Sequence, residues 1–506
     1  MSGAPYLDML RWLAPEVLLA VTAGVVLFVD LGLARSRPLQ FRSRLAGGLT
    51  VLGMLAGLAW LCQVPIVARW GGGILALGPL TSVVKGVLVG LTVLTVLIAM
   101  GSDPPPHVGE FYALMVLATV GMCLMVSSRE MLMIFLALEL TSLCLYVLTA
   151  FQPRNPGAVR AALQYFLFGS VASAFLLFGF SLWYGLCGST GLADVAAALR
   201  ARGLDPLAGV ALVMVITGLG FKVAAVPFHL WAPETYRGAP TPVAALIAAG
   251  SKVASFVLLA QVLGVGLDAV AGSAAWGGWR SGWMPVAAVL AVGSMAWGNL
   301  AALVQDDVKR LLAYSAIAHG GYLIVGLFAV VQPADHGLGV SAMVYYLATY
   351  GLTLVGAFGV ISVLERQGVG SRFADLAGLS RRSPLLAGCW LVLLLSLAGI
   401  PPLAGFFGKF YVFTMAVAAG GGDLGLLWLV VVAILFSAVS LYYYLKALKP
   451  VFVQPPTASA APLRITLTEG IALGVIVAAV VLLGVLPGWI VDGVLEAVQA
   501  QSWLSN

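Results

Sequence analysis

The sequence predicts an all-α protein that crosses a membrane many times. Of its 506 residues, 61% are hydrophobic and only 9% are charged, whereas soluble domains carry about 25% charged residues. Fourteen apolar segments follow one another along the chain. They are too long and too continuous to be strands of a membrane β-barrel, so helix is the expected state. These observations exclude a soluble enzyme, a disordered chain and a disulfide-stabilised secreted domain.

Each expected helix contains about 20 apolar residues, the length that crosses the hydrocarbon core of a bilayer. The fourteen helices are expected at residues 12–33, 45–65, 76–101, 111–127, 131–151, 159–187, 206–230, 241–264, 284–303, 312–331, 338–364, 384–418, 424–448 and 466–490. The 60 glycines of the chain suit close helix packing in lipid. The longest expected loops, 264–284 and 364–384, leave no room for a soluble domain.

Lysine and arginine are distributed unevenly between the two ends of these helices. Loops after odd-numbered helices contain sixteen of them, and the opposite loops contain six. Because cytoplasmic loops are enriched in Lys and Arg, we expect the odd loops in the cytoplasm and both termini outside. The net charge of +6 therefore concerns orientation in a membrane rather than binding to nucleic acid.

The sequence lacks the patterns that hold redox cofactors or metal ions. Its five cysteines are dispersed without a C-x-x-C pair, and its four histidines form no H-x-x-H motif, whereas metal and iron–sulfur sites need clustered ligands. No glycine-rich dinucleotide-binding loop follows a strand pattern. We therefore expect this chain to bind no metal and no cofactor of its own.

Four ionisable residues fall well inside the expected helices: Glu139, Lys222, Lys252 and Lys409. At 1.5 Å per residue, Glu139 and Lys222 lie about 12 Å from the nearest helix end, and Lys252 lies about 14 Å from it. These depths are near the midplane of a core about 30 Å thick. A charge there costs at least a few kcal/mol, so we interpret these residues as functional candidates.

The residue types in this set suit proton transfer. A lysine in apolar surroundings gives up its proton more readily, and a nearby carboxylate opposes that effect. A row of such groups, joined by water and by His, Ser and Tyr side chains, would form a proton path. A structural ion pair, for instance Glu139 with Lys222, is the alternative, although one carboxylate does not balance three lysines. We expect structural or interfacial roles for Lys85 and Asp30, and a helix-start role for Glu16.

Two of the expected helices, the seventh and the twelfth, contain proline close to a lysine. Pro227 follows Lys222 in the seventh, and Pro401 and Pro402 precede Lys409 in the twelfth. Proline interrupts a helix because it removes a backbone donor. Within a membrane such breaks occur where protein or a wet cavity satisfies the freed groups. A pair of similarly placed breaks is typical of transporters built from inverted repeats.

A repeat at an offset of 180 residues supports that interpretation. It pairs Ala162 with Ala342, Tyr165 with Tyr345, Leu167 with Leu347, Phe178 with Phe358 and Gly179 with Gly359. The same offset places Glu139 at His319. The expected organisation is a three-helix segment at 1–110, a five-helix repeat at 111–264, an inverted five-helix repeat at 284–450 and a C-terminal helix within 451–506.

Two long stretches of this chain resemble the antiporter-like membrane subunits of respiratory complex I. They are residues 220–243, GFKVAAVPFHLWAPETYRGAPTPV, and residues 307–322, DVKRLLAYSAIAHGGY. The resemblance covers about residues 110–450. Within that family, the chain length, the absence of room for a long lateral helix, and LALELTSLCLYVL at 136–148 are most similar to the subunit N branch of bacterial NADH:quinone oxidoreductase.

The resemblance implies roles for particular residues. Glu139 matches the carboxylate that influences the lysine of the seventh helix, and Lys222 matches that lysine. Lys252 matches the central relay lysine, and Lys409 matches the group nearest the outer exit. One departure is Gln164, where many relatives would carry a lysine.

Two histidines lie in the matching stretches, namely His229 and His319. Each is expected either to serve the water chain or to make a structural hydrogen bond. Both alternatives remain open at the level of the sequence.

The resemblance also implies a setting for the chain. It would be a proton-translocating subunit of an NADH:quinone oxidoreductase in the bacterial inner membrane, beside other membrane-arm subunits. NADH, FMN, iron–sulfur clusters and quinone would bind to partner subunits, so the chain would belong to an enzyme without holding its redox centre. The alternative is a subunit of a multisubunit cation/proton antiporter or of a membrane-bound hydrogenase. A stand-alone transporter would need a polar substrate pocket at the midplane, which the sequence does not offer.

Overall fold

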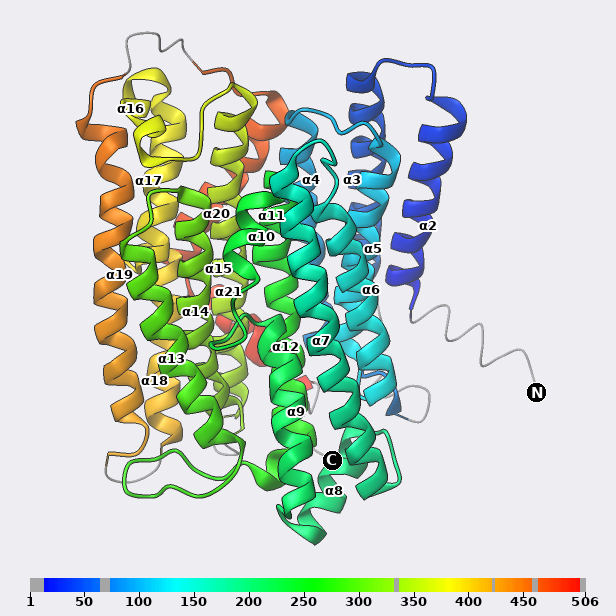
Figure 1. Cartoon of the computed structure of the whole chain (residues 1–506), viewed down its shortest axis with the longest axis vertical. Helices are drawn as coiled ribbons and strands as arrows, with labels where there is room; N and C mark the ends of the chain where they lie inside the picture. The colour runs from blue at the N-terminus through cyan, green and yellow to red at the C-terminus, as the bar shows by residue number, and fades with distance from the viewer. Residues whose placement is uncertain (1–12, 64–72, 332–335, 421–423, 457–462, 501–506) are drawn as a thin grey trace.

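The computed structural model describes residues 13–63, 73–331, 336–420, 424–456 and 463–500. Within these ranges the chain forms helices joined by turns and by isolated β-bridges. Most helices run side by side along the long axis of the molecule (Figure 1). The helices α2 (Ala14–Phe28) and α3 (Leu39–Leu61) lie at one edge, and α19 (Leu427–Val453) lies at the opposite edge.

Twelve helical segments of the described residues are long and apolar enough to cross a membrane. They are α2 with the π-helix η1 (Val29–Leu33), α3, α4 (Pro79–Gly101), α5 (Val108–Ser127), α6 (Met131–Thr149), α7 (Pro156–Cys187), the run of α11 (Thr241–Leu246), η3 (Ile247–Ser251), α12 (Lys252–Gln261) and η4 (Val262–Gly266), α13 (Trp283–Leu303), α14 (Val308–Val330), α15 (His336–Arg366), α19 and α20 (Leu467–Val485). The predicted class, an all-helical membrane protein, is therefore confirmed.

The two other expected spans, in which the sequence predicts proline breaks, fall on shorter helices. Twelve of the fourteen expected spans are thus long helices of the described residues, and the other two stay a prediction. The segment 206–230 holds α9 (Pro206–Lys222), which is followed by turns and by α10 (Ala232–Gly238). The segment 384–418 holds α17 (Pro384–Ala398) and α18 (Ala404–Ala419), which are separate helices. Pro227 lies in the first interruption, and Gly399, Pro401 and Pro402 lie in the second; neither residue type continues a helix well.

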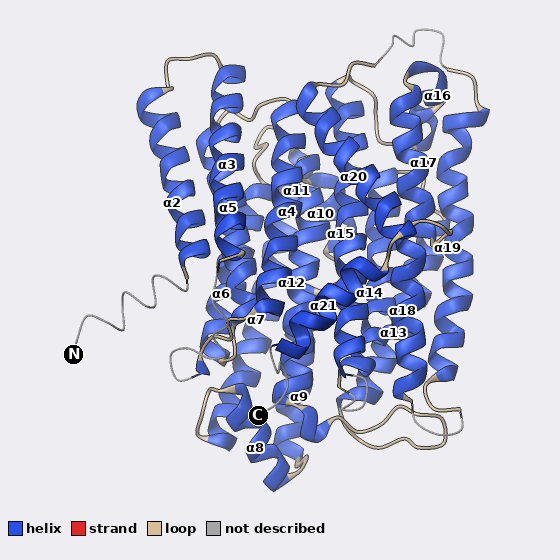
Figure 2. Cartoon of the chain, turned by 180° about the vertical axis from the view of Figure 1, so that it is seen from behind, coloured by secondary structure: helices blue, strands red, loops and turns tan. Residues whose placement is uncertain are grey.

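Besides α10, three helices were not expected from the sequence. They are α8 (Leu192–Arg202), the short α16 (Leu379–Arg382) and α21 (Gly488–Ala500). The C-terminal segment thus holds two helices rather than one. Figure 2 shows α21 running obliquely across the long helices, where it packs against α15 and α4. These helices are too short or too polar to give a spanning signal.

The core of the molecule lies along three central segments. The apolar window of Thr241–Gly266 is completely buried, and those of Val308–Val330 and Gly337–Arg366 are 94% and 89% buried. The corresponding windows of α2 and α3 are only 33% buried. Apolar side chains of the outer helices therefore face lipid or partner chains, while the central helices are surrounded by protein.

Two ion pairs hold the first helices together. Asp30 accepts two hydrogen bonds from Arg42 at 2.7 Å and a third from the Gly109 amide at 2.9 Å. Lys85 lies 2.6 Å from Glu16, and both side chains are at most 5% exposed. Asp30 and Lys85 thus each form a buried ion pair, which agrees with the structural roles expected for them. Glu16 is the buried counter-ion of Lys85, which its place in the first turn of α2 did not reveal.

Candidate functional site

Lys222 is the last residue of α9 and is 8% exposed. Its Nζ donates a hydrogen bond of 2.6 Å to Ser142 Oγ on α6. The rings of Tyr146 and Phe221 lie 5.9 and 5.4 Å from the ammonium group. The helix ends at this lysine, and Ala224 two residues later has φ +57°. That left-handed conformation is uncommon for a residue with a Cβ, and it turns the chain out of the helix.

Glu139 lies one helical turn before Ser142 on α6 and is partly buried. Its carboxylate accepts a hydrogen bond of 2.5 Å from Ser173 on α7. Residues three positions apart share a helix face, so Glu139 is on the side of α6 that holds the partner of Lys222. The ion pairs of the described residues do not join Glu139 to Lys222. A direct structural pair between them, the alternative considered above, is therefore wrong.

Lys252 is the first residue of α12 and directly follows the π-helical turn η3. It is 3% exposed, and its Nζ donates to the backbone carbonyl of Ala316 on α14. A Cβ atom added at Gly320 would lie 3.7 Å from this Nζ and 3.4 Å from the carbonyl oxygen of Val223. The broken end of α9 and the amine of Lys252 therefore meet at the same glycine of α14.

His319 lies on α14 and is 2% exposed. Its Nδ1 is 2.8 Å from the hydroxyl of Tyr346, and its Nε2 is 3.3 Å from that of Tyr444. The ring of Tyr350 lies 4.9 Å from the imidazole, and the Nζ of Lys252 lies 5.8 Å from the same tyrosine ring. Lys252 and His319 thus share one aromatic neighbour.

Lys409 lies on α18, after the interruption that follows α17, and is 5% exposed. Its Nζ donates to the carbonyl of Ala398 at 3.0 Å and to Ser437 Oγ at 2.9 Å. Ala398 is the last residue of α17, so its carbonyl has no partner in the next helical turn. Gly399, with φ +85°, makes the turn, and a Cβ there would lie 3.3 Å from the lysine Nζ.

The sequence identified six candidates, and the structure brings five of them into this interior. His229 is buried in the connection between α9 and α10, but among the described residues its ring contacts Trp297 of α13. Trp297 is 54% exposed and faces outward. Its Nδ1 is buried without a hydrogen-bond partner among the described residues, so the expected part of His229 in the water chain stays a prediction.

The hydroxyl-bearing side chains around this row were missed at the sequence level. They are Ser142, Ser173, Ser315, Tyr322, Tyr346, Tyr350, Ser437 and Tyr444. Serine and tyrosine are common in membrane helices, so their presence alone carries no signal. The spacing of four residues between Tyr346 and Tyr350 would have placed both on one face. Only the tertiary structure shows that this face contacts His319.

Comparison with known proteins identifies chains that are similar to this one in sequence. Residues 128–437 match the model of the family described as NADH:quinone oxidoreductase/Mrp antiporter, transmembrane. The chain is 47% identical over 498 residues to the NADH-quinone oxidoreductase subunit N 2 of Acidobacterium capsulatum, covering 96% of this chain and 98% of that protein.

Two solved structures extend the comparison to the fold. A chain of respiratory complex I from Thermus thermophilus, solved with bound aureothin, superposes with a TM-score of 0.77 at 34% identity and covers 94% of this chain and 98% of that one. A chain of the Mrp complex from Dietzia superposes with a TM-score of 0.79 at 21% identity, covering 97% and 99%. The second likeness concerns the fold alone.

Proposed function

The chain belongs to the subunit N family of NADH-quinone oxidoreductases, and from this premise we propose that it translocates protons in the membrane arm of a respiratory complex. The observation that carries the proposal is the row of buried basic groups inside the protein. Lys222, Lys252, His319 and Lys409 are each at most 8% exposed. Buried ionisable groups within a membrane are costly and mark ion pathways.

The neutral partners of these lysines support a role in proton transfer. Lys222 donates to a serine, Lys252 to a carbonyl, and Lys409 to a carbonyl and a serine. Oxygen atoms of this kind accept from an ammonium and do not hold its charge in place as a carboxylate does. A proton can therefore leave one lysine and end on the neutral amine of the next, with hydroxyls and water between them.

We assign the individual roles as follows. Glu139, which shares a face of α6 with the Lys222 partner Ser142, acts on Lys222 through its negative charge, and this charge sets how readily the lysine holds a proton. Lys252 and His319 form the central relay, and Lys409 passes the proton toward the outer side. His229 is assigned no transfer step.

We further propose that the two halves are inverted five-helix units, at 111–264 and 284–450, after a three-helix segment at 1–110 and before a C-terminal segment at 451–506. Support comes from the lysine that accompanies each helix interruption, Lys222 after α9 and Lys409 after α17. The loop charges support both termini lying outside a bacterial inner membrane.

In this proposal the chain works within an assembly. Other membrane-arm subunits are its partners, and NADH, FMN, iron–sulfur clusters and quinone are bound elsewhere in the complex. The redox reaction in those subunits drives proton transfer here.

The test is Lys222→Ala in the intact complex, in membrane vesicles. Proton uptake driven by NADH, followed by quenching of a pH-sensitive dye, should fall to background, and coupled quinone reduction should fall with it. The matched control is Lys446→Ala, since Lys446 donates to the Leu303 and Gln305 carbonyls at a helix end, outside the row. Wild-type proton uptake by an assembled Lys222→Ala complex would refute the proposal.

A cation/proton antiporter or membrane-bound hydrogenase subunit is the second candidate, because the family model and the Mrp likeness cover the same helices. Purification in mild detergent separates the two. Co-purifying flavin and iron–sulfur subunits support the respiratory complex, and their replacement by antiporter or hydrogenase subunits supports the alternative.

A further inference from the structure

A cavity of about 220 Å³ opens at the upper end of the molecule in Figure 1, where α4, α6, α11 and α15 begin or end. This is the end that the loop charges place in the cytoplasm. Its polar lining includes Asp103, Thr241, Ser362, Glu365 and Arg366. The cavity is a polar opening between the two proposed five-helix units.

Glu365 is the carboxylate at the wall of this cavity, and its side chain is 35% exposed. It lies 2.7 Å from the Nζ of Lys309 and accepts a hydrogen bond from Thr241 Oγ1. Thr241 is the first residue of the completely buried segment that leads to Lys252. Lys252 is eleven residues further along the chain, which corresponds to about 16 Å along that segment.

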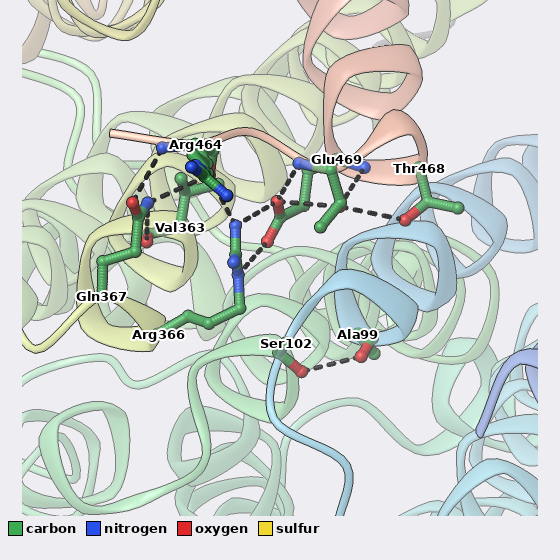
Figure 3. A network of polar contacts seen from close by, with 9 residues as sticks. Ala99, Ser102, Val363, Arg366, Gln367, Arg464, Thr468 and Glu469 are labelled. Atoms are coloured by element: carbon green, nitrogen blue, oxygen red, sulfur yellow. Dashed lines mark hydrogen bonds and ion pairs between the residues drawn. The ribbon is translucent and has the colours of Figure 1, made fainter. Parts of the chain in front are cut away.

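Arg366, the next residue on α15, has a different and fixed role. Figure 3 shows it directed at Glu469 at the start of α20, and its Nη2 also donates to the carbonyl of Arg464 at 2.7 Å. Its guanidinium lies 2.9 Å from Glu469, whose carboxylate is fully buried. Arg366 is therefore paired with Glu469. Glu365 is the acidic side chain of α15 that lines the cavity.

One face of α15 connects the cavity to the lysine row. Counting back from Glu365, positions at intervals of three or four residues carry Ser362, Phe358, Leu354, Tyr350 and Tyr346. Such positions share a helix face. The face therefore begins at the cavity and ends at the tyrosines around His319 and Lys252.

Polar atoms along this face are left without partners. Among the described residues, the buried hydroxyls of Tyr350 and Thr235 accept and donate no hydrogen bond. Thr235 is on α10 next to Tyr236, whose ring lies 6.0 Å from that of Phe358 on α15. Buried polar groups are ordinarily paired, and water is the usual partner where protein is not. These hydroxyls mark where water sits between the cavity and Lys252.

We propose that this cavity is the proton entrance of the chain, that Glu365 collects protons from the cytoplasm, and that Tyr350 and Thr235 anchor the water that carries them to Lys252. In each hop the donor loses an O–H bond and the acceptor gains one, and in the last hop a water O–H bond breaks as the N–H bond of Lys252 forms. A proton taken up by the Glu365 carboxylate ends on the neutral amine of Lys252, and the carboxylate is restored. This inference rests on the proposed function and adds the entrance to it.

The first test is Glu365→Gln in the intact complex, because glutamine keeps an oxygen for Thr241 and Lys309 but takes up no proton. The initial rate of NADH-driven proton uptake should fall about tenfold. The matched control is Asp306→Asn, which neutralises an 87% exposed carboxylate at the same end outside this cavity and should leave uptake unchanged.

The second test does not depend on the ion pair with Lys309. Tyr350→Phe removes a hydroxyl without a protein partner and keeps the ring beside Lys252, so assembly should be normal while proton uptake falls several-fold. The control is Tyr345→Phe, which removes a hydroxyl of the same helix that donates to the Leu483 carbonyl at 2.8 Å. Uptake by Tyr345→Phe should match the wild type.

The outcomes separate the entrance from the proposed function. If Lys222→Ala abolishes uptake but Glu365→Gln and Tyr350→Phe pump like the wild type, the entrance lies elsewhere and Glu365 is a structural partner of Lys309. If Lys222→Ala itself pumps normally, the proposed function fails. A fall in Glu365→Gln alone, with normal Tyr350→Phe, contradicts the path along α15.

Discussion

At the scale of single residues, the buried charges of this protein divide into two kinds. Some are closed in carboxylate pairs within the described residues, namely Arg42 with Asp30, Lys85 with Glu16 and Arg366 with Glu469. Lys222, Lys252 and Lys409 have only neutral oxygen partners in the hydrogen bonds described above. A paired ammonium is stabilised in its charged form by the carboxylate beside it. An ammonium with neutral partners can lose its proton without leaving an unpaired buried carboxylate.

Glu139→Gln tests the carboxylate of this row. Glutamine still accepts the hydrogen bond from Ser173, so we expect normal assembly. Loss of the negative charge changes the proton affinity of Lys222, and coupled turnover should fall by roughly an order of magnitude. The measurement is NADH-driven quinone reduction in sealed vesicles. Glu496→Gln on α21, an exposed carboxylate, is the control, and wild-type turnover of Glu139→Gln would leave Glu139 only a structural role.

For single residues, the sequence predicts which charged side chains are buried but not which atoms they contact. A lysine such as Lys252 stands out because an apolar helix rarely contains one, so its burial could be anticipated. Its partners could not, because the carbonyl of Ala316 comes from a helix distant in the chain. The contact of His229 with Trp297 likewise could not be anticipated from the sequence, and the role of this histidine stays a prediction.

At the scale of helices, the interruption between α17 and α18 is held by a neighbour. A Cβ atom at Gly484 of α20 would overlap the carbonyl oxygen of Pro402 and lie 2.7 Å from the amide of Ala404. The glycine therefore lets α20 approach the broken segment directly. Prolines in the sequence indicated the break, but the helix that covers it could be identified only from the fold.

Gly484→Ala should consequently displace the broken segment and the start of α18. We expect less assembled complex and a thermal midpoint lowered by a few degrees, because overpacking costs about 1–3 kcal/mol. Gly474→Ala is the matched control on the same helix, since a Cβ there meets nothing within 4 Å. Equal thermal midpoints for the two variants would show that the approach of α20 is not tight.

At the scale of the whole molecule, hydropathy located the long spans well and failed on the elements that do not span. The expected segment 466–490 was followed by α21, whose charged residues and short length hide it from a hydropathy criterion. Orientation is a property of the loops rather than of helix packing, so the bias of Lys and Arg is its main predictor.

The predicted orientation can be checked with cysteine labelling. In a Cys62→Ser background, which removes the exposed native cysteine, Asp306→Cys should react with an impermeant maleimide only in inside-out vesicles. Glu496→Cys, near the C-terminus, should react only in right-side-out vesicles. The reverse pattern would invert the whole assignment, including the cytoplasmic position of Glu365.

The contact between Lys409 and the last carbonyl of α17 has a mechanical consequence. The carbonyl end of a helix carries a partial negative charge, which a cation stabilises. Here the cation belongs to the following helix, so the ammonium of α18 fastens α18 to the end of α17 across the break. When the Lys409 amine is neutral, its electrostatic attraction to the carbonyl end of α17 is lost. We therefore expect protonation of Lys409 to change the angle between α17 and α18.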